Sequence, residues 1–165
     1  MANSPQVSER PQQPYFGLRQ RVEGTVQQAV DGAFPELFHR LGRQRVRPGG
    51  PPFIRFLEID AAGEPRELEL GVPVDQDAAT ATLPAGRYAT LVHIGPYRHD
   101  TEPDLAAARA RLLAWIKVQG LTPGTYLERY RIGPVEERDW TKWETELASP
   151  SSSAMSKRAR RLRPF

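Results

Sequence analysis

The chain has 165 residues, of which 39% are hydrophobic, which suits one ordinary folded domain with tails. It contains no cysteine, which excludes disulfides and thiolate chemistry, and its formal net charge is +3. No apolar run reaches the roughly 18 residues that a membrane span needs, and the sequence starts without a signal-peptide pattern. We therefore expect a cytoplasmic protein with no membrane partner.

The positive charge is concentrated at the C-terminal end. Five of the 23 basic residues and none of the 20 acidic residues follow Pro150, so the rest of the chain is slightly acidic. A basic face that follows a phosphate backbone is not supported, and we expect no direct DNA binding. Residues 151–165 are predicted to form a disordered basic tail, for which weak binding to polyanions stays open.

The N-terminal segment, residues 1–14, is rich in Pro, Gln and Ser and is expected to be flexible. The folded domain is predicted to span residues 15–150. It starts with a strand in "PYFGLRQRVEG", and Thr25 is placed to cap the helix that follows. Apolar residues recur along this helix at three- and four-residue spacing, and Gly32 and Pro35 predict a kink or break within it.

Two strands, "FIRFLEID" and "ELELGVPV", follow this helix, separated by the turn "AAGEPR". The chain then repeats the order strand, helix, strand, strand in "GRYATLVHIGPY", "EPDLAAARARLLAWIKVQG", "TYLERYRI" and "KWETELASP". Gly120 is predicted to close the second helix.

A short motif also repeats, because residues 69–73 (Glu-Leu-Gly-Val-Pro) match residues 146–150 (Glu-Leu-Ala-Ser-Pro) in the same place of each half. The sequence therefore predicts an α+β fold of duplicated β-α-β-β units about a pseudo-twofold axis. In this fold an antiparallel sheet carries two helices on one side and a ligand groove on the other.

The stretch "TYLERYRI" places Tyr126, Glu128 and Tyr130 on one face of an extended strand. Aromatic rings attract cations and also accept flat apolar surface. A carboxylate among them loses solvation, so it favours a cationic partner. If this face lines the groove, the pattern indicates binding of hydrophobic cations or amphipathic aromatic compounds.

The same alternation is also typical of the solvent face of an antiparallel strand, where Glu128 would pair with Arg55 or Arg131. The opposite face holds Leu127, Arg129 and Arg131, which would have to pack under a helix. Two arginines suit that position poorly unless they reach the edge of the sheet.

Catalytic and metal-binding motifs are missing from the sequence. His39, His93 and His99 match no metal-ligand spacing, and there is no serine nucleophile elbow or glycine-rich phosphate loop. His93 is a candidate acid or base, but one histidine in a strand is more often structural. We expect no metal and no cofactor, and a binding protein rather than an enzyme.

In order along the chain, "GGPPFIRF", "GRYATLVHIGPY", "LLAW", "YLERY" and "WETEL" resemble the GyrI-like small-molecule-binding domain. This domain also forms the effector-binding half of some MerR-type and AraC-type multidrug regulators. The resemblance implies a fold related to the SOUL haem-binding proteins, with a ligand in the groove between the halves. No DNA-binding helix-turn-helix fits into residues 1–14, so we expect a stand-alone form.

Matched to the family pattern, Glu128 is the central acid of the pocket, Glu146 a second acid, and Tyr130 the aromatic residue that follows the first. The family's usual Asp-Pro turn is replaced here by "IGPVEE", which leaves the rim of the pocket undefined. The predicted ligand-binding set is completed by further aromatic residues: Tyr126, Trp115, Tyr97 and Phe56.

Three functions stay open at the level of sequence. The first is sequestration or sensing of small hydrophobic or cationic aromatic compounds. The second follows from the resemblance of some stand-alone members to hydrolases of cyclopropane-type reactive compounds, in which Glu128 would act as general base. The third is inhibition of a partner protein such as gyrase. Monomer and dimer are both compatible with the sequence.

Overall fold

A computed structural model describes residues 4–97 and 105–153 of the chain. These residues contain two α-helices and nine strands, and every strand pair with an assigned register is antiparallel, which confirms the α+β class. They divide into two compact units. Unit 1 holds the described residues of 1–10, 86–126 and 131–165, and unit 2 holds residues 11–85 and 127–130.

Unit 2 contains the first repeat. Its helix α1 (Val26–Arg43) starts where predicted, because the Thr25 hydroxyl accepts from the Gln28 N–H while the Gln28 side chain accepts from the Thr25 N–H. The helix runs on through Pro35 without the predicted break. Leu37 and Leu41 are buried along it, so packing outweighs the hydrogen bond that Pro35 cannot donate.

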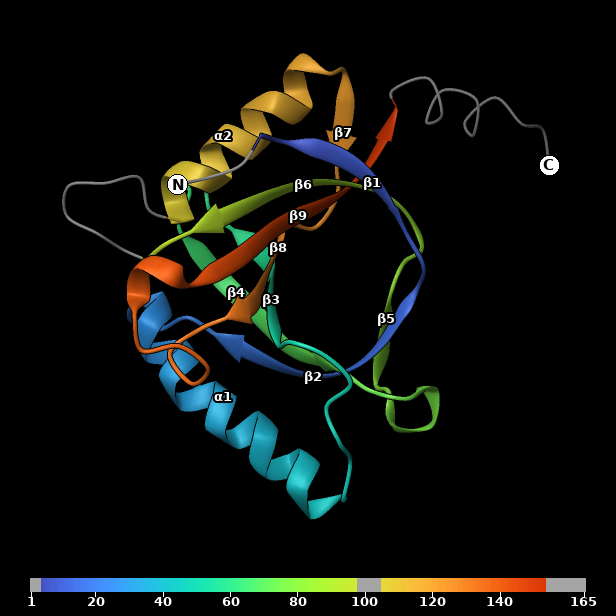
Figure 1. Ribbon diagram of the computed structural model, residues 1–165, viewed down its shortest axis with the longest axis vertical. Coiled ribbons are helices and arrows are strands. Elements are labelled where there is room, and N and C mark those ends of the chain that lie inside the picture. Colours follow the sequence, from blue (N-terminus) through green and yellow to red (C-terminus); the bar gives the residue numbers. More distant parts are fainter. Residues whose placement is uncertain (1–3, 98–104, 154–165) are drawn as a thin grey trace. The chain divides into compact units, whose positions relative to one another are not determined.

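The strands of unit 2 pair in the order β5-β2-β4-β3-β8, and α1 contacts β2 and β4 (Figure 1). Their bounds are β2 (Gln13–Arg21), β3 (Phe53–Ile59), β4 (Pro65–Pro73), β5 (Ala81–Leu83) and β8 (Leu127–Ile132), of which residues 127–130 belong to this unit. Both faces of β4 are buried, since Leu68 and Leu70 alternate with Glu69 and Gly71. The polar Glu69 on such a strand needs internal partners.

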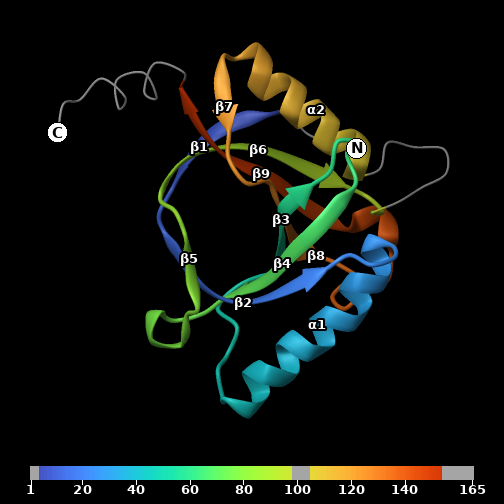
Figure 2. The ribbon, with the colours of Figure 1, turned by 180° about the vertical axis from the view of Figure 1, so that it is seen from behind.

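Unit 1 contains most of the second repeat. Its strands pair in the order β1-β6-β9, and β7 pairs with the end of β9. Helix α2 contacts β6, β7 and β9. Figure 2 shows β7 beside α2. The bounds are β1 (Gln6–Arg10), β6 (Gly86–Ile94), α2 (Leu105–Val118), β7 (Leu121–Pro123) and β9 (Glu144–Ser153). Gly120 follows α2 with φ +69°, as its predicted role at the helix end requires.

The duplicated order is confirmed as β2-α1-β3-β4 followed by β6-α2-β8-β9, with three short strands added. Two of these precede the repeats and are exchanged between them: β1 leads into β2 but pairs with β6, while β5 leads into β6 but pairs with β2. Residues 1–14, expected to be flexible, therefore include an ordered strand. The basic residues of the predicted tail lie outside the described residues.

Within residues 4–97 and 105–153, no helix combines the length and apolar character that crossing a membrane requires.

Candidate ligand-binding site

The face of β8 that carries Glu128 and Tyr130 is turned toward α1. Glu128 lies opposite Ile54 of β3, and directly opposed residues of an antiparallel pair share a face. Tyr130, two residues further along, meets the edge of Phe34 of α1, with ring centroids 6.4 Å apart. We expected this face to point away from the helices and Leu127 and its neighbours to pack beneath a helix, so the predicted facing of β8 is wrong in unit 2.

The facing of β8 is explained by the other face of β3, where Arg55 lies opposite Leu127. Arg55 donates from Nη1 to Glu69 Oε1 at 2.8 Å and to Tyr15 Oη at 2.9 Å, and Tyr15 Oη donates to Glu69 Oε1 at 2.6 Å. Because this face of the sheet contains the Glu69 carboxylate, charged and polar side chains on it find partners that they would not find beneath a helix.

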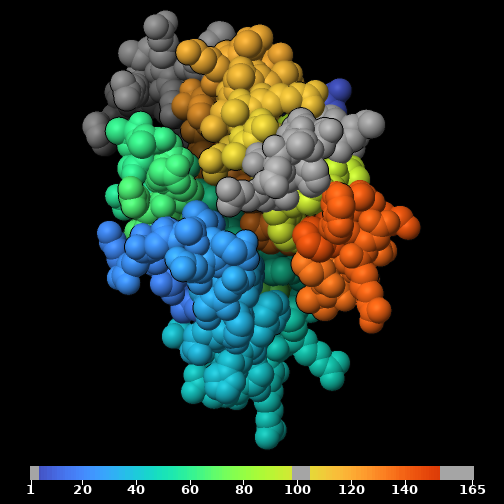
Figure 3. Space-filling model, turned by 90° about the vertical axis from the view of Figure 1, so that its left-hand side faces the viewer, coloured from blue at the N-terminus to red at the C-terminus, as the bar shows by residue number. Residues whose placement is uncertain are grey.

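Glu128 begins a chain of aromatic contacts that leads from the interior of unit 2 to its surface. The acid is 5% exposed, and the Tyr130 hydroxyl donates to its Oε2 at 2.9 Å. From Tyr130 the contacts continue to Phe34, whose ring stacks on Phe38 at 6.3 Å between centroids. Phe38 is 42% exposed. Figure 3 shows the atoms of α1, coloured blue to cyan, on the face turned to the viewer. We call these four residues the acid-aromatic cluster.

The sequence assigned Phe34 and Phe38 to the apolar stripe of α1, so it missed them as site residues. Their stripe has two parts, because Ala33, Leu37 and Leu41 are buried whereas Phe38 is not. A large aromatic side chain that is exposed on an otherwise buried stripe is the signal that could have found them.

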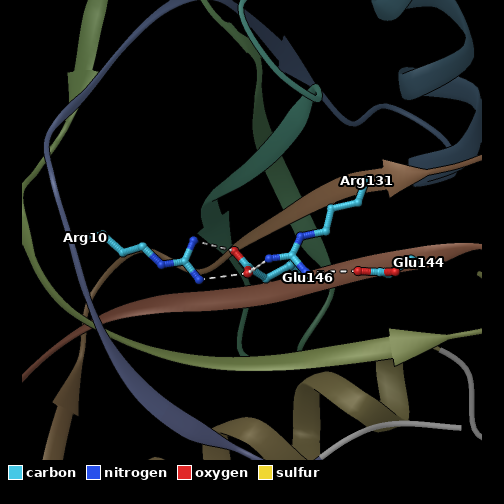
Figure 4. A network of polar contacts seen from close by, with 4 residues as sticks. All are labelled: Arg10, Arg131, Glu144 and Glu146. Atoms are coloured by element: carbon cyan, nitrogen blue, oxygen red, sulfur yellow. Dashed lines mark hydrogen bonds and ion pairs between the residues drawn. The ribbon is translucent and has the colours of Figure 1, made fainter.

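Glu146, the second predicted acid, lies in unit 1 and is held by two arginines (Figure 4). Arg10 of β1 donates from Nη1 to Glu146 Oε1 at 3.0 Å and from Nη2 to Oε2 at 2.8 Å, and Arg131 Nη2 donates to Oε2 at 2.6 Å. Arg131 also donates to Glu144 at 3.0 Å. The Glu146 side chain is 2% exposed, so the arginines compensate the charge of a buried carboxylate.

Glu69, a second buried acid of unit 2, occupies the position that corresponds to Glu146 in the repeated motif. Burial and then the hydrogen bond to Glu69 raise the pKa of Tyr15 to about 12. Burial by itself would lower the pKa of Arg55, but its bonds to Glu69 and Tyr15 raise it above the ordinary value. The repeated motif in the sequence contains Glu69 but gives no sign of its partners Arg55 and Tyr15.

The other predicted site residues have different surroundings. In unit 1 the Arg109 guanidinium lies over the Tyr126 ring, with Cζ 5.8 Å from its centroid, and Tyr97 lies against Trp143 at 4.8 Å between centroids. Trp115 is half-buried on α2. Phe56, in unit 2, is buried on the face of β3 that it shares with Ile54 and Glu128. The structure therefore brings Glu128, Tyr130 and Phe56 to one face of unit 2.

His93 is buried on β6 opposite Thr145 of β9. Its Nε2 lies 2.9 Å from the Pro96 carbonyl oxygen, which only accepts, so Nε2 carries a hydrogen. Within the part of the chain that is described, His93 Nδ1 and Thr145 Oγ1 are buried without a hydrogen-bond partner. His93 thus lies beneath the surface of unit 1, with its ring bound to the Pro96 carbonyl.

A metal site is not formed by the described residues, which contain no group of three or more His, Cys, Asp or Glu side chains arranged to hold an ion. The candidate site is the acid-aromatic cluster, in which the Glu128 carboxylate is followed by three aromatic rings. Such a site recognises charge and apolar shape with few directional hydrogen bonds.

The sequence model of the GyrI-like small molecule binding domain matches residues 4–150. The chain belongs to this GyrI-like family. The match covers both repeats and all four residues of the acid-aromatic cluster. No curated protein sequence matches the chain significantly.

Solved structures with the same GyrI-like fold include the C-terminal domain of EcmrR, with a TM-score of 0.76 at 17% identity over 92% of this chain and 98% of that domain. EcmrR in its complex with DNA gives 0.75 at 18% identity, and there the match over 92% of this chain spans 58% of the EcmrR chain. SAV2435 bound to tetraphenylphosphonium gives 0.58 at 15% identity, over 96% of this chain and 99% of that one. A hydrolase encoded by lin2189 from Listeria innocua gives 0.55 at 13% identity, over 90% and 91%. At these identities the likeness shows the fold alone.

Proposed function

We propose that this GyrI-like domain binds hydrophobic organic cations, with Glu128 supplying the charge and Tyr130, Phe34 and Phe38 the aromatic surface. The observation that carries the proposal is the continuous series of contacts from the buried carboxylate to the exposed Phe38. The Glu128 carboxylate attracts a ligand cation placed beside it, and the rings accept the apolar groups around that cation.

The family and one neighbour support this ligand class. The family model describes a small-molecule-binding domain, and SAV2435 was solved with tetraphenylphosphonium, a cation surrounded by four phenyl rings. The chemistry of such a compound is complementary to one acid and several aromatic side chains. Sequestration or sensing of such compounds is the role that we propose for the protein.

Calorimetric titration with tetraphenylphosphonium tests the proposal. Glu128→Gln keeps the shape of the side chain and removes its charge, and we expect its affinity to fall about tenfold, equivalent to roughly 1.4 kcal/mol. Glu58→Gln, at an exposed position of β3, makes the same change in net charge and should alter the affinity less than twofold. Equal affinities for wild type and Glu128→Gln would refute the role of the carboxylate.

Hydrolysis of cyclopropane-type reactive compounds is the second candidate. It is favoured by the Tyr130 hydrogen bond, which fixes the orientation of the Glu128 carboxylate, and by the hydrolase from Listeria innocua among the structures of similar fold. In this role Glu128 would take a proton from water while the water oxygen attacks a ring carbon. The strained C–C bond then breaks, and the carbon that receives its electron pair takes the proton back from the Glu128 carboxyl group. Turnover of such a compound should be lost in Glu128→Ala, and turnover no faster than in buffer would rule this candidate out.

A further inference from the structure

The end of α1 departs twice from the usual choice of residues at the end of a helix. Arg45, which follows the C-cap, has φ +57°, and it is the only residue other than glycine with a positive φ in residues 4–97 and 105–153. The N–H of Arg45 donates to the Gly42 carbonyl at 3.1 Å and that of Val46 to the Leu41 carbonyl at 3.0 Å. Helices that end in this way usually have glycine where Arg45 stands.

The nearby glycine, Gly42, instead lies within the last turn of α1, where glycine is less favourable than alanine. Both choices are locally unfavourable, since a side chain is strained at a positive φ. Local rules of this kind are most often broken where a protein binds something. We therefore asked what surface the two residues form.

Together they leave an open basic surface at the end of α1. Gly42 lies one helical turn beyond the exposed Phe38, and a Cβ at Gly42 would meet no atom within 4 Å. Arg43, Arg45 and Arg47 are exposed around it. Arg43 has an ion pair at 4.0 Å, whereas Arg45 and Arg47 have no hydrogen bond or ion pair within the described ranges. We call these five residues the arginine strip.

The chain also carries a surface of complementary character in residues 133–139, which follow β8. Val135 is 94% exposed and is followed directly by Glu136 and Glu137, and the segment holds three acids and one base. The N–H groups of both glutamates donate to one carbonyl, at 3.1 and 2.9 Å, which orders the turn. Each carboxylate accepts one backbone hydrogen bond, Glu136 at Oε2 and Glu137 at Oε1, so its other oxygen is available to an arginine.

We propose that the arginine strip binds residues 133–139 of a second copy of this chain. Val135 of one copy packs against Phe38 and the open surface of Gly42 on the other, and the two glutamates pair with the arginines. Each copy presents both surfaces, so each gives and receives the contact. A nucleic acid suits the strip less well, because the chain before residue 151 is slightly acidic and does not continue a path for phosphates.

Sedimentation equilibrium of the full chain measures the dissociation constant of self-association. Arg45→Glu and Glu137→Arg should each weaken association at least about tenfold, because each places like charges across the contact. An equal mixture of the two variants should associate about as tightly as the wild type, because opposite charges then face each other again at each contact. A role of Arg45 that is confined to ending α1 predicts no such recovery.

Two glycine substitutions test the open surface. Gly42→Ala adds a methyl group to the strip, and Gly32→Ala adds one elsewhere on α1, also where nothing lies within 4 Å. We expect Gly42→Ala to weaken association at least about fivefold and Gly32→Ala to leave it unchanged. No ligand is present in these measurements, so their outcome is independent of the proposed function.

The proposal is overturned if the wild type stays monomeric up to its solubility limit, if either charge reversal leaves association unchanged, or if the mixture does not recover it. Equal association of Gly42→Ala and Gly32→Ala overturns the packing of Val135 on the strip. A monomeric wild type that binds polyglutamate or single-stranded DNA overturns the proposal as well, because the strip then serves a partner of another kind.

Discussion

The substitution Glu146→Gln tests whether this acid stabilises unit 1 or binds ligands. Glu146 accepts three charge-assisted hydrogen bonds, two from Arg10 and one from Arg131. Glutamine retains one acceptor oxygen but turns an NH2 group toward a guanidinium, so at least one bond is replaced by two facing donors. Breaking a buried ion pair can cost about 3–5 kcal/mol.

The expected loss is smaller here because both arginines keep contact with water. Their side chains are 29% and 37% exposed, so each recovers solvation when Glu146 loses its charge. We expect Glu146→Gln to lower the free energy of unfolding by about 2–3 kcal/mol. For a chain of this size, that corresponds to a fall in Tm of roughly 4–12 °C.

Urea unfolding followed by circular dichroism gives the stability, and calorimetric titration with tetraphenylphosphonium gives the affinity. Glu144→Gln is the matched control, because Glu144 makes one bond to Arg131, and its loss should stay below about 1 kcal/mol. Affinity should be unchanged in Glu146→Gln. A variant of normal stability that binds the cation poorly would show that Glu146 is a ligand acid and that the argument from its arginines is mistaken.

Four further substitutions test the polar contacts and the packing of the two units. Because the pKa of Tyr15 is raised to about 12 in the folded protein, its contribution to stability is complete below pH 10 and is lost as the pH rises toward 12. In urea titrations, the free energy of unfolding of wild type relative to Tyr15→Phe should therefore fall by about 1.4 kcal/mol between pH 9 and pH 11. Gly71→Ala would place a Cβ 2.6 Å from Phe53 Cζ, so it should lower the free energy of unfolding by about 1–3 kcal/mol. Gly32→Ala is the control: an added Cβ at this position of α1 meets open space, so the substitution should raise the free energy of unfolding. The buried Thr145 hydroxyl has no hydrogen-bond partner among residues 4–97 and 105–153. Thr145→Val removes it and should raise thermal stability by the equivalent of about 1 kcal/mol, whereas a decrease would show that a group such as a buried water satisfies the hydroxyl.

Local signals in the sequence predicted the elements that depend on near neighbours. Thr25 caps α1 through a residue three positions away, and Gly120 ends α2 through its own backbone conformation, so both predictions are confirmed. The strand β1 was missed because Gln6–Arg10 is polar and its partner β6 lies far along the chain. A strand that is stabilised by distant pairing leaves little trace in its own composition.

The facing of β8 could not be predicted because both of its faces carry charged residues. Glu128 and Tyr130 on one face, and Arg129 on the other, give no hydrophobic contrast from which to choose the buried side. The choice depends on a contact with Phe34 and on the Glu69 and Arg55 pair across β3 and β4, which are all remote in sequence. For the same reason, the acid of the candidate site was recognised while its aromatic neighbours on α1 were not.

The repeated motif separates acids that stabilise the fold from the acid that we assign to a ligand. Glu69 and Glu146 occupy corresponding positions, and each is buried and bound by an arginine of a neighbouring strand. Both halves therefore bury an acid at the same position of the motif and neutralise its charge within the same unit, which is a role in the stability of the fold. Glu128 lies outside this motif, opposite Ile54, and is followed by aromatic rings that reach the surface. Duplication accounts for the first two acids, and the proposed cation would account for the third.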